Sequence, residues 1–224
     1  MCGRYTLSHP GEMLEQLAVV DALDHELEPR YNIAPTQSVP AVRADGDGAR
    51  RLVALRWGLV PFWADDLAIG NRMINARSET AASKPAFRAA FARRRCLLLA
   101  DGFFEWVARE RGPKQPFHIH RPDRTPFAFA GLWERWDKGE AAVESCTILT
   151  TAASEAMTPY HHRMPVVLEG AARDRWLSDD ADRSELESLA GPFTGELTFT
   201  PVSRLVNNPR NDVPRCIEPL LGDA

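Results

Sequence analysis

Short strand-like runs recur along most of the sequence, and they constrain its fold more than any other feature. Each run alternates polar and apolar residues or is wholly apolar, and Gly, Pro and Asp separate the runs, as is typical of β-strands. The runs are "RLVALRW", "RCLLLADG", "FFEWVA", "PFHIH", "FAFAGLW", "ESCTILT", "MPVVL" and "LTFTPV". Helical patterns do not regularly follow them, which disfavours a parallel, doubly wound sheet. The sequence therefore predicts an α+β fold, with a mainly antiparallel curved sheet or partial β-barrel and a few short helices.

Helical signals are few and short. A first helix is expected after Ser8, with Met13, Leu14 and Leu17 on one face. A second is expected from Ser83, as N-cap, through the triple arginine that ends at Arg95. Two more are expected over residues 171–178 and 183–190. The chain of 224 residues suits one domain, which we expect to span residues 1–224.

Composition excludes several classes of protein. No apolar run reaches the length of about 18 residues that a membrane span needs, and no basic segment followed by an apolar one indicates a secretory signal. The cysteines are far apart and form no C-x-x-C pair, so a cytoplasmic protein without a disulfide framework is expected; they are Cys2, Cys96, Cys146 and Cys216. The net charge of −4 does not suggest a general nucleic-acid binder.

Signatures of cofactor and metal sites are also missing from the sequence. It contains no G-x-x-x-x-G-K, H-E-x-x-H or G-x-S-x-G pattern. His118 and His120 share one face of an expected strand, as in some metal sites, but no third ligand is evident nearby. We therefore expect neither a metal nor a cofactor.

Cys2 is unusual, because a residue next to the initiator Met is poorly placed for a core. If Met1 is removed, Cys2 carries a free α-amine and a free thiol on adjacent carbons. This pair of groups is chemically distinctive, and it raises the question of what it reacts with.

Three polar stretches lie where a core strand would be expected to be apolar. In "INARSET", extended backbone would put Asn75, Arg77 and Glu79 on one face, although a solvated strand edge explains the pattern equally well. Glu105 lies between Phe104 and Trp106, either as an exposed strand residue or as a desolvated carboxyl suited to acid–base work. The stretch "YHHRMP" offers two histidines beside an arginine, and histidine transfers protons well near neutral pH.

Two further stretches are patterned without an obvious chemical role. "RWGLVPFWADD" (56–66) puts aromatic residues in a loop, where they stack on bases in some proteins and more often cover a core edge. "PVSRLVNNPRNDVPRCIEP" (201–219) is too polar for a core strand and too patterned for a tail. The residues alone give no chemical account of this second stretch.

Together these stretches resemble the SRAP family, the SOS-response-associated peptidase-like proteins. The matches run in the family's order from residue 2 to about residue 219: "MCGRY", "YNIAPTQ", "RWGLVPFWADD", "INARSET", "PAFRAAFARRRCLLLADGFFEW", "HHRMPVVL" and "PVSRLVNNPRNDVPRCIEP". Residues 96–100 are more apolar than the family pattern, which affects packing rather than the site. The resemblance implies a single α+β domain with a barrel-like antiparallel sheet.

The resemblance also implies an activity. Members of the family sense abasic sites in single-stranded DNA and form a covalent crosslink through the N-terminal Cys, which shields the lesion. Some nick the strand by β-elimination, and the family name reflects a peptidase activity suggested for removal of the residue before Cys2. The implied partner is single-stranded DNA with abasic sites, including single-strand–duplex junctions at stalled forks. We expect a monomer, associated with the nucleoid when it is bound to DNA.

The chemistry of an N-terminal cysteine agrees with this activity. An abasic deoxyribose equilibrates with an open-chain aldehyde, and an α-amine with a reference pKa of about 8 is partly neutral at pH 7. The amine can form a Schiff base with the aldehyde, and the neighbouring thiol can then close a five-membered thiazolidine ring at a large effective molarity. This chemistry requires that Met1 be removed.

Roles for individual residues follow from the resemblance. Glu105 is implied as the acid–base group, His161 as a proton shuttle through its match to His-x-Arg-Met-Pro, and Asn75 as the residue that orients the sugar or the Cys2 amine. His162 lies next to His161, and whether it shares that role is left open. The implied DNA contacts are phosphate contacts by Arg4, Arg77 and Arg163 and stacking by Trp63 and, less directly, Phe62.

Two other functions remain open from the sequence. One is an N-terminal-nucleophile amidohydrolase or peptidase, since "MCG" also begins glutamine amidotransferase domains, in which the Cys thiol attacks an amide and the α-amine acts as base. That hypothesis explains Cys2 but not the Arg and Trp elements. A non-covalent single-strand-binding module explains the Arg and Trp elements but makes Cys2, Glu105 and His161 incidental.

Overall fold

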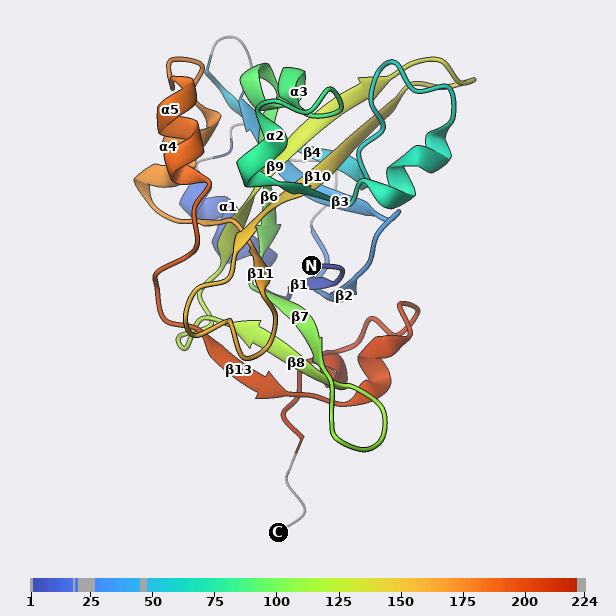
Figure 1. The fold of residues 1–224 in the computed structure, drawn as a ribbon, viewed down its shortest axis with the longest axis vertical. Coiled ribbons are helices and arrows are strands. Elements are labelled where there is room, and N and C mark those ends of the chain that lie inside the picture. The colour runs from blue at the N-terminus through green and yellow to red at the C-terminus, as the bar shows by residue number, and fades with distance from the viewer. Residues whose placement is uncertain (1, 18, 20–26, 45–47, 221–224) are drawn as a thin grey trace.

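A closed ring of five strands forms the larger part of the molecule (Figure 1). The computed structural model describes residues 2–17, 19, 27–44 and 48–220. Strand β10 pairs with β9 on one edge and with β4 on the other, which closes the ring. The β4–β10 pair is parallel and the other pairs are antiparallel. In order around the ring the strands are β4 (Arg50–Trp57), β3 (Ser38–Ala44), β6 (Arg95–Ala100), β9 (Phe127–Trp136) and β10 (Val143–Ala152).

Three short strands extend the ring. β5 (Asn75–Arg77) continues the β4 edge of β10 in parallel, and β11 (Arg163–Pro165) pairs with the same end of β10 in antiparallel fashion. β12 (Val167–Leu168) pairs with β9. The end of β10 around Thr150 therefore has Arg77 of β5 and Pro165 of β11 as partners.

A second, wholly antiparallel sheet of five strands lies against one end of the barrel (Figure 1). Its order is β13 (Thr198–Pro201), β8 (Gln115–His120), β7 (Gly102–Val107), β1 (Tyr5–Leu7) and β2 (Arg30–Ile33). Tyr5 of β1 joins the two parts, because its ring lies 5.3 Å from Trp57 of β4 and 5.6 Å from Phe129 of β9, measured between centroids.

The predicted strand runs correspond to observed strands, and the predicted fold class is confirmed. All six residues of β6 are buried, and after Arg95 the strand is wholly apolar. The run "MPVVL" is divided between β11 and β12. Strands β1, β2 and β3 were not predicted, since they are short or contain a proline, Pro40. No helix among the described residues is long and apolar enough to cross a membrane.

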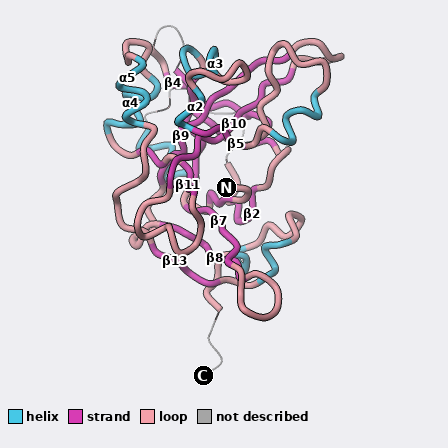
Figure 2. Tube along the Cα trace, viewed as in Figure 1, coloured by secondary structure: helices cyan, strands magenta, loops and turns pink. Residues whose placement is uncertain are grey.

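The helices are short; the α-helices lie around the barrel, and two 3-10 helices of the C-terminal segment lie against the second sheet (Figure 2). They are α1 (Pro10–Leu17), α2 (Ser78–Ala81), α3 (Arg88–Arg93), α4 (Ala171–Leu177) and α5 (Arg183–Leu189), with three 3-10 helices, η1 (Leu67–Arg72), η2 (Arg204–Asn207) and η3 (Pro214–Cys216). The predictions for α1, α4 and α5 are confirmed to within a few residues.

Two local predictions are wrong. Ser83 is not the N-cap of the second predicted helix, which begins at Arg88; its hydroxyl and its N–H donate to the carbonyl of Thr80 and so close the end of α2. Glu79 does not share a strand face with Asn75, because the strand ends at Arg77 and the chain turns into α2, which buries Ser78 and Ala81. The predicted removal of Met1 concerns a residue outside the described ones.

Candidate active site

Cys2 lies three residues before the first residue of β1, where backbone and side-chain hydrogen bonds fix it. Its carbonyl accepts a hydrogen bond from Nδ2 of Asn75 at 2.8 Å, and its thiol lies 3.8 Å from the carbonyl of Arg4. The side chain is fully buried. Burial, and after it the charge of the Glu105 carboxylate, raises the pKa of the Cys2 thiol to about 12. The thiol is therefore protonated at neutral pH, and Cys2 and Asn75 are in direct contact, as the proposed site requires.

Glu105 reaches the same region from the neighbouring strand. Tyr5 of β1 pairs with Phe103 of β7, and the N–H of Phe104 donates to the carbonyl of Arg4 at 3.0 Å. Continuing this register places Glu105 of β7 opposite Gly3, next to Cys2. Glu105 is only 5% exposed, and burial raises the pKa of its carboxyl to about 7. A carboxyl with this pKa can both donate and accept a proton near neutral pH.

His161 lies in the loop before β11, and its ring is held by the backbone. Its Nδ1 lies 2.9 Å from the backbone nitrogen and 3.1 Å from the carbonyl oxygen of Arg163. Burial lowers the pKa of His161, and the adjacent His162 lowers it further. The two imidazoles are stacked, with centroids 4.3 Å apart. His161 is therefore mainly neutral at pH 7.

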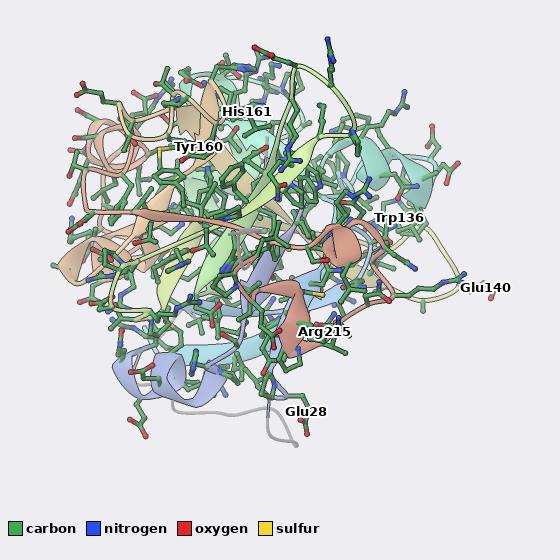
Figure 3. All side chains as sticks on the ribbon, turned by 90° about the horizontal axis from the view of Figure 1, so that it is seen from below. Glu28, Trp136, Glu140, Tyr160, His161 and Arg215 are labelled. Atoms are coloured by element: carbon green, nitrogen blue, oxygen red, sulfur yellow. The ribbon has the colours of Figure 1, made fainter. Side chains whose placement is uncertain are left out.

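An aromatic contact connects the loop of His161 with the strand of Glu105. Phe117 of β8 is the cross-strand partner of Glu105, so their side chains share one face. The ring of Phe117 packs edge-on against Tyr160, which directly precedes His161, with centroids 4.9 Å apart. Figure 3 shows Tyr160 and His161 together on one side of the molecule. The charge of Lys114 lowers the pKa of both Glu105 and His161, which agrees with their lying in one region.

The three predicted phosphate-binding arginines differ in the protein groups to which their guanidinium groups are already bound. Arg77 is exposed and forms no ion pair with a described residue. Arg163 is held from two sides: its two terminal nitrogens bind the carboxylate of Glu79 at 2.5 and 2.9 Å, and Nη2 also donates to the carbonyl of Thr150 at 2.5 Å. Arg4 is half-buried and donates to neutral oxygens, which are described below. Only Arg77 therefore presents an entirely unoccupied guanidinium.

Trp63 and Phe62 lie in the loop between β4 and η1 and are exposed, by 43% and 54% respectively. Trp63 borders a hollow of about 610 Å³ that Ile69 and Arg72 of η1 also line. Among the described residues, no hydrogen bond or ring contact joins Trp63 to Cys2 or to the other catalytic candidates. The loop therefore offers an aromatic surface that is separate from the buried cluster.

The two histidines of β8 are buried and contact other residues of the second sheet. His118 and His120 have ring centroids 5.1 Å apart, and their Nε2 atoms lie 3.1 Å from the hydroxyls of Thr6 and Thr200, respectively. In the described part of the chain, no group of three or more His, Cys, Asp and Glu residues is arranged to hold a metal ion.

Comparison with known proteins agrees with the resemblance in sequence and in fold. The model of the SOS response associated peptidase (SRAP) family matches residues 1–209. The chain belongs to the SRAP family. It is 41% identical over 223 residues to the abasic site processing protein YoqW of Bacillus subtilis, covering 97% of this chain and 99% of that protein.

More distant SRAP relatives cover the chain equally well. The abasic site processing protein YedK of Escherichia coli is 32% identical over 229 residues, covering 98% of this chain and all of that protein. A crystal structure of a protein from Bacteroides thetaiotaomicron has the same fold, with a TM-score of 0.84 at 24% identity, over 98% of this chain and all of that one. The SRAP fold therefore accounts for the whole architecture described above.

Several polar residues of the site region were not predicted from the sequence. Glu79 was expected in an extended segment and lies in α2, while Asn32 and Asp212 lie in motifs to which the sequence assigned no role. The N–H of Asn32 donates to the carboxylate of Asp212, although the two residues lie 180 positions apart in the sequence. The only feature of the sequence that could have pointed to Asn32 and Asp212 is the unexplained polarity of "YNIAPTQ" and "NDVP".

Proposed function

We propose that this protein recognises abasic sites in single-stranded DNA and captures them covalently through the amine and the thiol of Cys2. The observation that carries the proposal is the juxtaposition of Cys2, held by Asn75, with a buried Glu105 whose pKa is about 7. The relatives reported above are named abasic site processing proteins, which supports this substrate. The reaction requires that residue 1 be removed, because only then does Cys2 carry an α-amine.

The first step joins the amine to the sugar. The neutral α-amine attacks the C1′ aldehyde of the ring-opened deoxyribose and gives a carbinolamine. Protonated Glu105 then donates a proton to the departing hydroxyl, which leaves as water, and a Schiff base remains. His161, neutral at pH 7, can accept the proton that the amine loses.

The second step closes the ring. The thiol adds to the imine carbon, so that an Sγ–C1′ bond forms and the thiol proton passes to the imine nitrogen. The overall balance is one aldehyde and one aminothiol giving one thiazolidine and one water. Because the attack is intramolecular, the high pKa of the thiol is tolerated, since the imine nitrogen takes up the proton as the bond forms.

The same imine offers a route to strand cleavage. A base that removes a proton from C2′ allows the 3′ phosphate to leave by β-elimination. Glu105, once it has given up its proton, and His161 are the candidate bases for this step. We propose that this lyase reaction competes with ring closure, and that the cluster of Cys2, Glu105 and His161 also assists removal of residue 1.

The amidotransferase-like alternative is less well supported. An N-terminal cysteine that attacks an amide does so as a thiolate. Burial, and after it the charge of Glu105, raises the pKa of the Cys2 thiol to about 12, so that little thiolate is present at neutral pH. This environment suits a reaction that begins at the amine and uses the thiol second.

DNA would be held by the arginines around this cluster. Arg77 is free to bind a phosphate, Arg4 is positioned two residues after Cys2, and Arg163 can bind a phosphate only by exchanging Glu79 for it. Phe62 and Trp63 offer rings for stacking on neighbouring bases, or for separating a duplex at a junction. These contacts read no base edges, in keeping with recognition of a lesion rather than a sequence.

A denaturing gel tests the proposal directly. Protein with Met1 removed is incubated with a single-stranded oligonucleotide bearing one abasic site. We expect a slower-migrating covalent band that survives heating. The band should be absent with Cys2→Ala, and absent when Met1 or an added residue precedes Cys2. No band with the processed wild-type protein would refute covalent capture.

Two further results separate the alternatives. Glutamine hydrolysis without a crosslink would favour the amidotransferase-like function, and non-covalent retention without a crosslink would favour a binding module. Asn75→Ala should slow band formation while leaving affinity for DNA nearly unchanged, because its amide contacts Cys2 and no phosphate-binding arginine among the described residues.

A further inference from the structure

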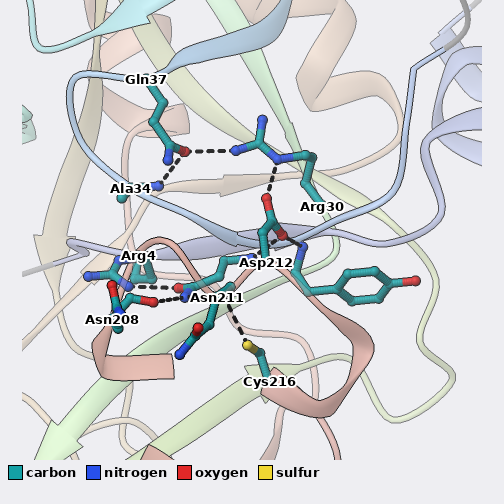
Figure 4. Close-up of polar contacts among 10 residues, drawn as sticks. Arg4, Arg30, Ala34, Gln37, Asn208, Asn211, Asp212 and Cys216 are labelled. Atoms are coloured by element: carbon teal, nitrogen blue, oxygen red, sulfur yellow. Dashed lines mark hydrogen bonds and ion pairs between the residues drawn. The ribbon is translucent and has the colours of Figure 1, made fainter. Parts of the chain in front are cut away.

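The polar segment near the C-terminus folds onto β2 and is fastened there by one carboxylate. Asp212 accepts hydrogen bonds from the N–H groups of Tyr31 and Asn32, at 2.5 and 3.0 Å, and from Nε of Arg30 (Figure 4). Arg30 also donates to Oε1 of Gln37 at 2.8 Å. The ion pair between Arg30 and Asp212 neutralises the carboxylate and keeps η2 and η3 against β2, the edge strand of the second sheet.

Asn32 lies at the centre of this contact, and its side chain is fully buried. Its Nδ2 donates to the carbonyls of Val206, Asn208 and Asn211 at 3.2, 3.0 and 2.7 Å. Its Oδ1 accepts from Nη1 of Arg4 at 2.7 Å. With its polar atoms occupied and no exposed surface, Asn32 cannot touch a ligand itself. It can act only through the groups that it holds, and Arg4 is the charged one.

Arg4 is held from one side only, and by neutral groups. Nη1 donates to Oδ1 of Asn32 and to the carbonyl of Val206, at 2.7 and 2.8 Å. The guanidinium carbon lies 5.9 Å from the ring centroid of Trp106. Among the described residues, no carboxylate pairs with Arg4 and no hydrogen bond reaches its Nη2. Arg30 and Arg163, in contrast, are neutralised by Asp212 and Glu79.

We propose that Asn32 is a positioning residue for DNA binding: it fixes one terminal nitrogen of Arg4 and so directs the other, Nη2, towards a phosphate next to the lesion. The inference rests on the proposed function, since it assumes DNA as the ligand. A guanidinium can serve both sides because its donors form a rigid planar fork. Holding one nitrogen removes side-chain freedom that would otherwise be lost on binding.

The chemical identity of residue 32 fits this role. A carboxylate at this position would hold Arg4 equally well but would neutralise the charge that a phosphate needs. An amide oxygen holds the guanidinium and leaves its net charge in place. The same amide supplies the N–H donors that satisfy three backbone carbonyls of the C-terminal segment, which a carboxylate could not do.

Binding can be measured apart from chemistry with an oligonucleotide that carries a tetrahydrofuran abasic analogue, because this analogue has no aldehyde. The Kd is measured by fluorescence anisotropy at several salt concentrations. We expect Arg4→Ala and Asn32→Ala each to weaken binding about 10-fold and to reduce the slope of log Kd against log salt by about 0.7, the value for one phosphate on a single strand. In the Arg4→Ala background, Asn32→Ala should change the Kd by less than about 2-fold.

A matched control lies in the same segment. The side chain of Asn208 accepts from the N–H of Arg210, and the hydrogen bonds of Arg4 with described residues go to Asn32 and Val206 instead, so Asn208→Ala should bind as the wild type does. If Asn32→Ala binds like the wild type, or if its effect adds fully to that of Arg4→Ala, the inference is wrong while the proposed function stands. A wild-type protein that does not bind the oligonucleotide contradicts the proposed function itself.

Arg4→Lys keeps the test decisive if Asn32→Ala does not fold. A lysine ammonium is a single centre, and Asn32 and Val206 already offer it two acceptors. We expect Arg4→Lys to lose affinity and salt slope as Arg4→Ala does, although the charge is retained. Wild-type affinity in Arg4→Lys would show that binding does not need one guanidinium to contact Asn32 and a phosphate at the same time, and would overturn the inference.

Discussion

At the scale of single residues, the environment of Glu105 links stability to function. The pKa of its carboxyl rises from 4.5 to about 7 because the side chain is buried beside Cys2. The folded protein therefore binds more protons than the unfolded chain between these two pH values. As a result, the free energy of unfolding falls as pH rises from about 4.5 to about 7, and the full penalty above pH 7 is on the order of 3 kcal/mol. A group suited to proton transfer is thus held at a cost to the fold.

Glu105→Gln removes both the penalty and the proposed acid–base group. At pH 8 the variant should be more stable than the wild type by up to about 3 kcal/mol, and the difference should vanish near pH 4.5. Crosslinking at pH 7 should slow about 100-fold. Urea unfolding at several pH values and the gel assay check both effects. Glu110→Gln, at an exposed position, is the control; a stability difference for Glu105→Gln that does not vary with pH would contradict the assignment.

The ion pair between Glu79 and Arg163 gives a second prediction at this scale. Glu79 occupies the fork of Arg163, and the arginine lowers the pKa of the carboxyl chiefly through their hydrogen bonds. Glu79→Gln should free Arg163 for a phosphate, strengthen binding of single-stranded DNA by about 3- to 10-fold, and steepen the salt dependence. Anisotropy measurements test this, with exposed Glu155→Gln as a control for net charge. Weaker binding would mean that Glu79 positions Arg163 instead.

At the scale of elements, β1 is fixed to the second sheet by a buried polar network. The hydroxyl of Thr6 donates to Asp101 at 2.6 Å and lies 3.1 Å from Nε2 of His118. The carboxylate of Asp101 also accepts from Ser8 and from the N–H of His9. These contacts bring the chain from β1 into α1 and set the position of Cys2, which lies just before β1.

Gly102 is the residue whose lack of a side chain allows this packing. A Cβ there would lie 2.1 Å from Nε2 of His118, whose ring also packs 5.0 Å from that of Phe104. Gly102→Ala should therefore destabilise the protein by about 1–3 kcal/mol. Gly11→Ala makes the same change in α1, where a Cβ meets no atom within 4 Å, and should stabilise by about 0.5–1 kcal/mol. Urea unfolding measures the free energy of unfolding of both variants. If Gly102→Ala and Gly11→Ala change it equally, the ring of His118 moves aside without cost and the prediction is wrong.

Elements differ in how far the sequence predicts them. Strands β4 and β6 to β10 were predictable because their apolar pattern reports burial directly. The candidate catalytic residues were proposed from motifs, since Cys2, Glu105 and Asn75 lie far apart in the sequence. The link from Asn32 to Asp212 could not be predicted, because a local pattern carries no information about partners 180 residues away. Glu79 was misplaced because alternation alone does not reveal where a strand gives way to a helix.

At the scale of the whole molecule, one residue couples the barrel, the second sheet and the site. The backbone of Tyr5 pairs with β2 and β7, while its ring lies inside the barrel end against Trp57 and Phe129. Cys2 lies three residues before it. The orientation of the N-terminal segment therefore depends on how firmly this ring is packed.

The hydroxyl of Tyr5 makes no hydrogen bond with a described residue that would add to this packing, and it is buried. Burying an unpaired hydroxyl costs about 1–3 kcal/mol, so Tyr5→Phe should raise the free energy of unfolding by about 1–2 kcal/mol and leave crosslinking intact. Tyr5→Ala should lower it by about 3–5 kcal/mol, because it opens a cavity where the two sheets meet, and should slow crosslinking by releasing β1. Urea unfolding and the gel assay distinguish the two; a Tyr5→Phe variant less stable than the wild type would mean that the hydroxyl, and not only the ring, holds the sheets together.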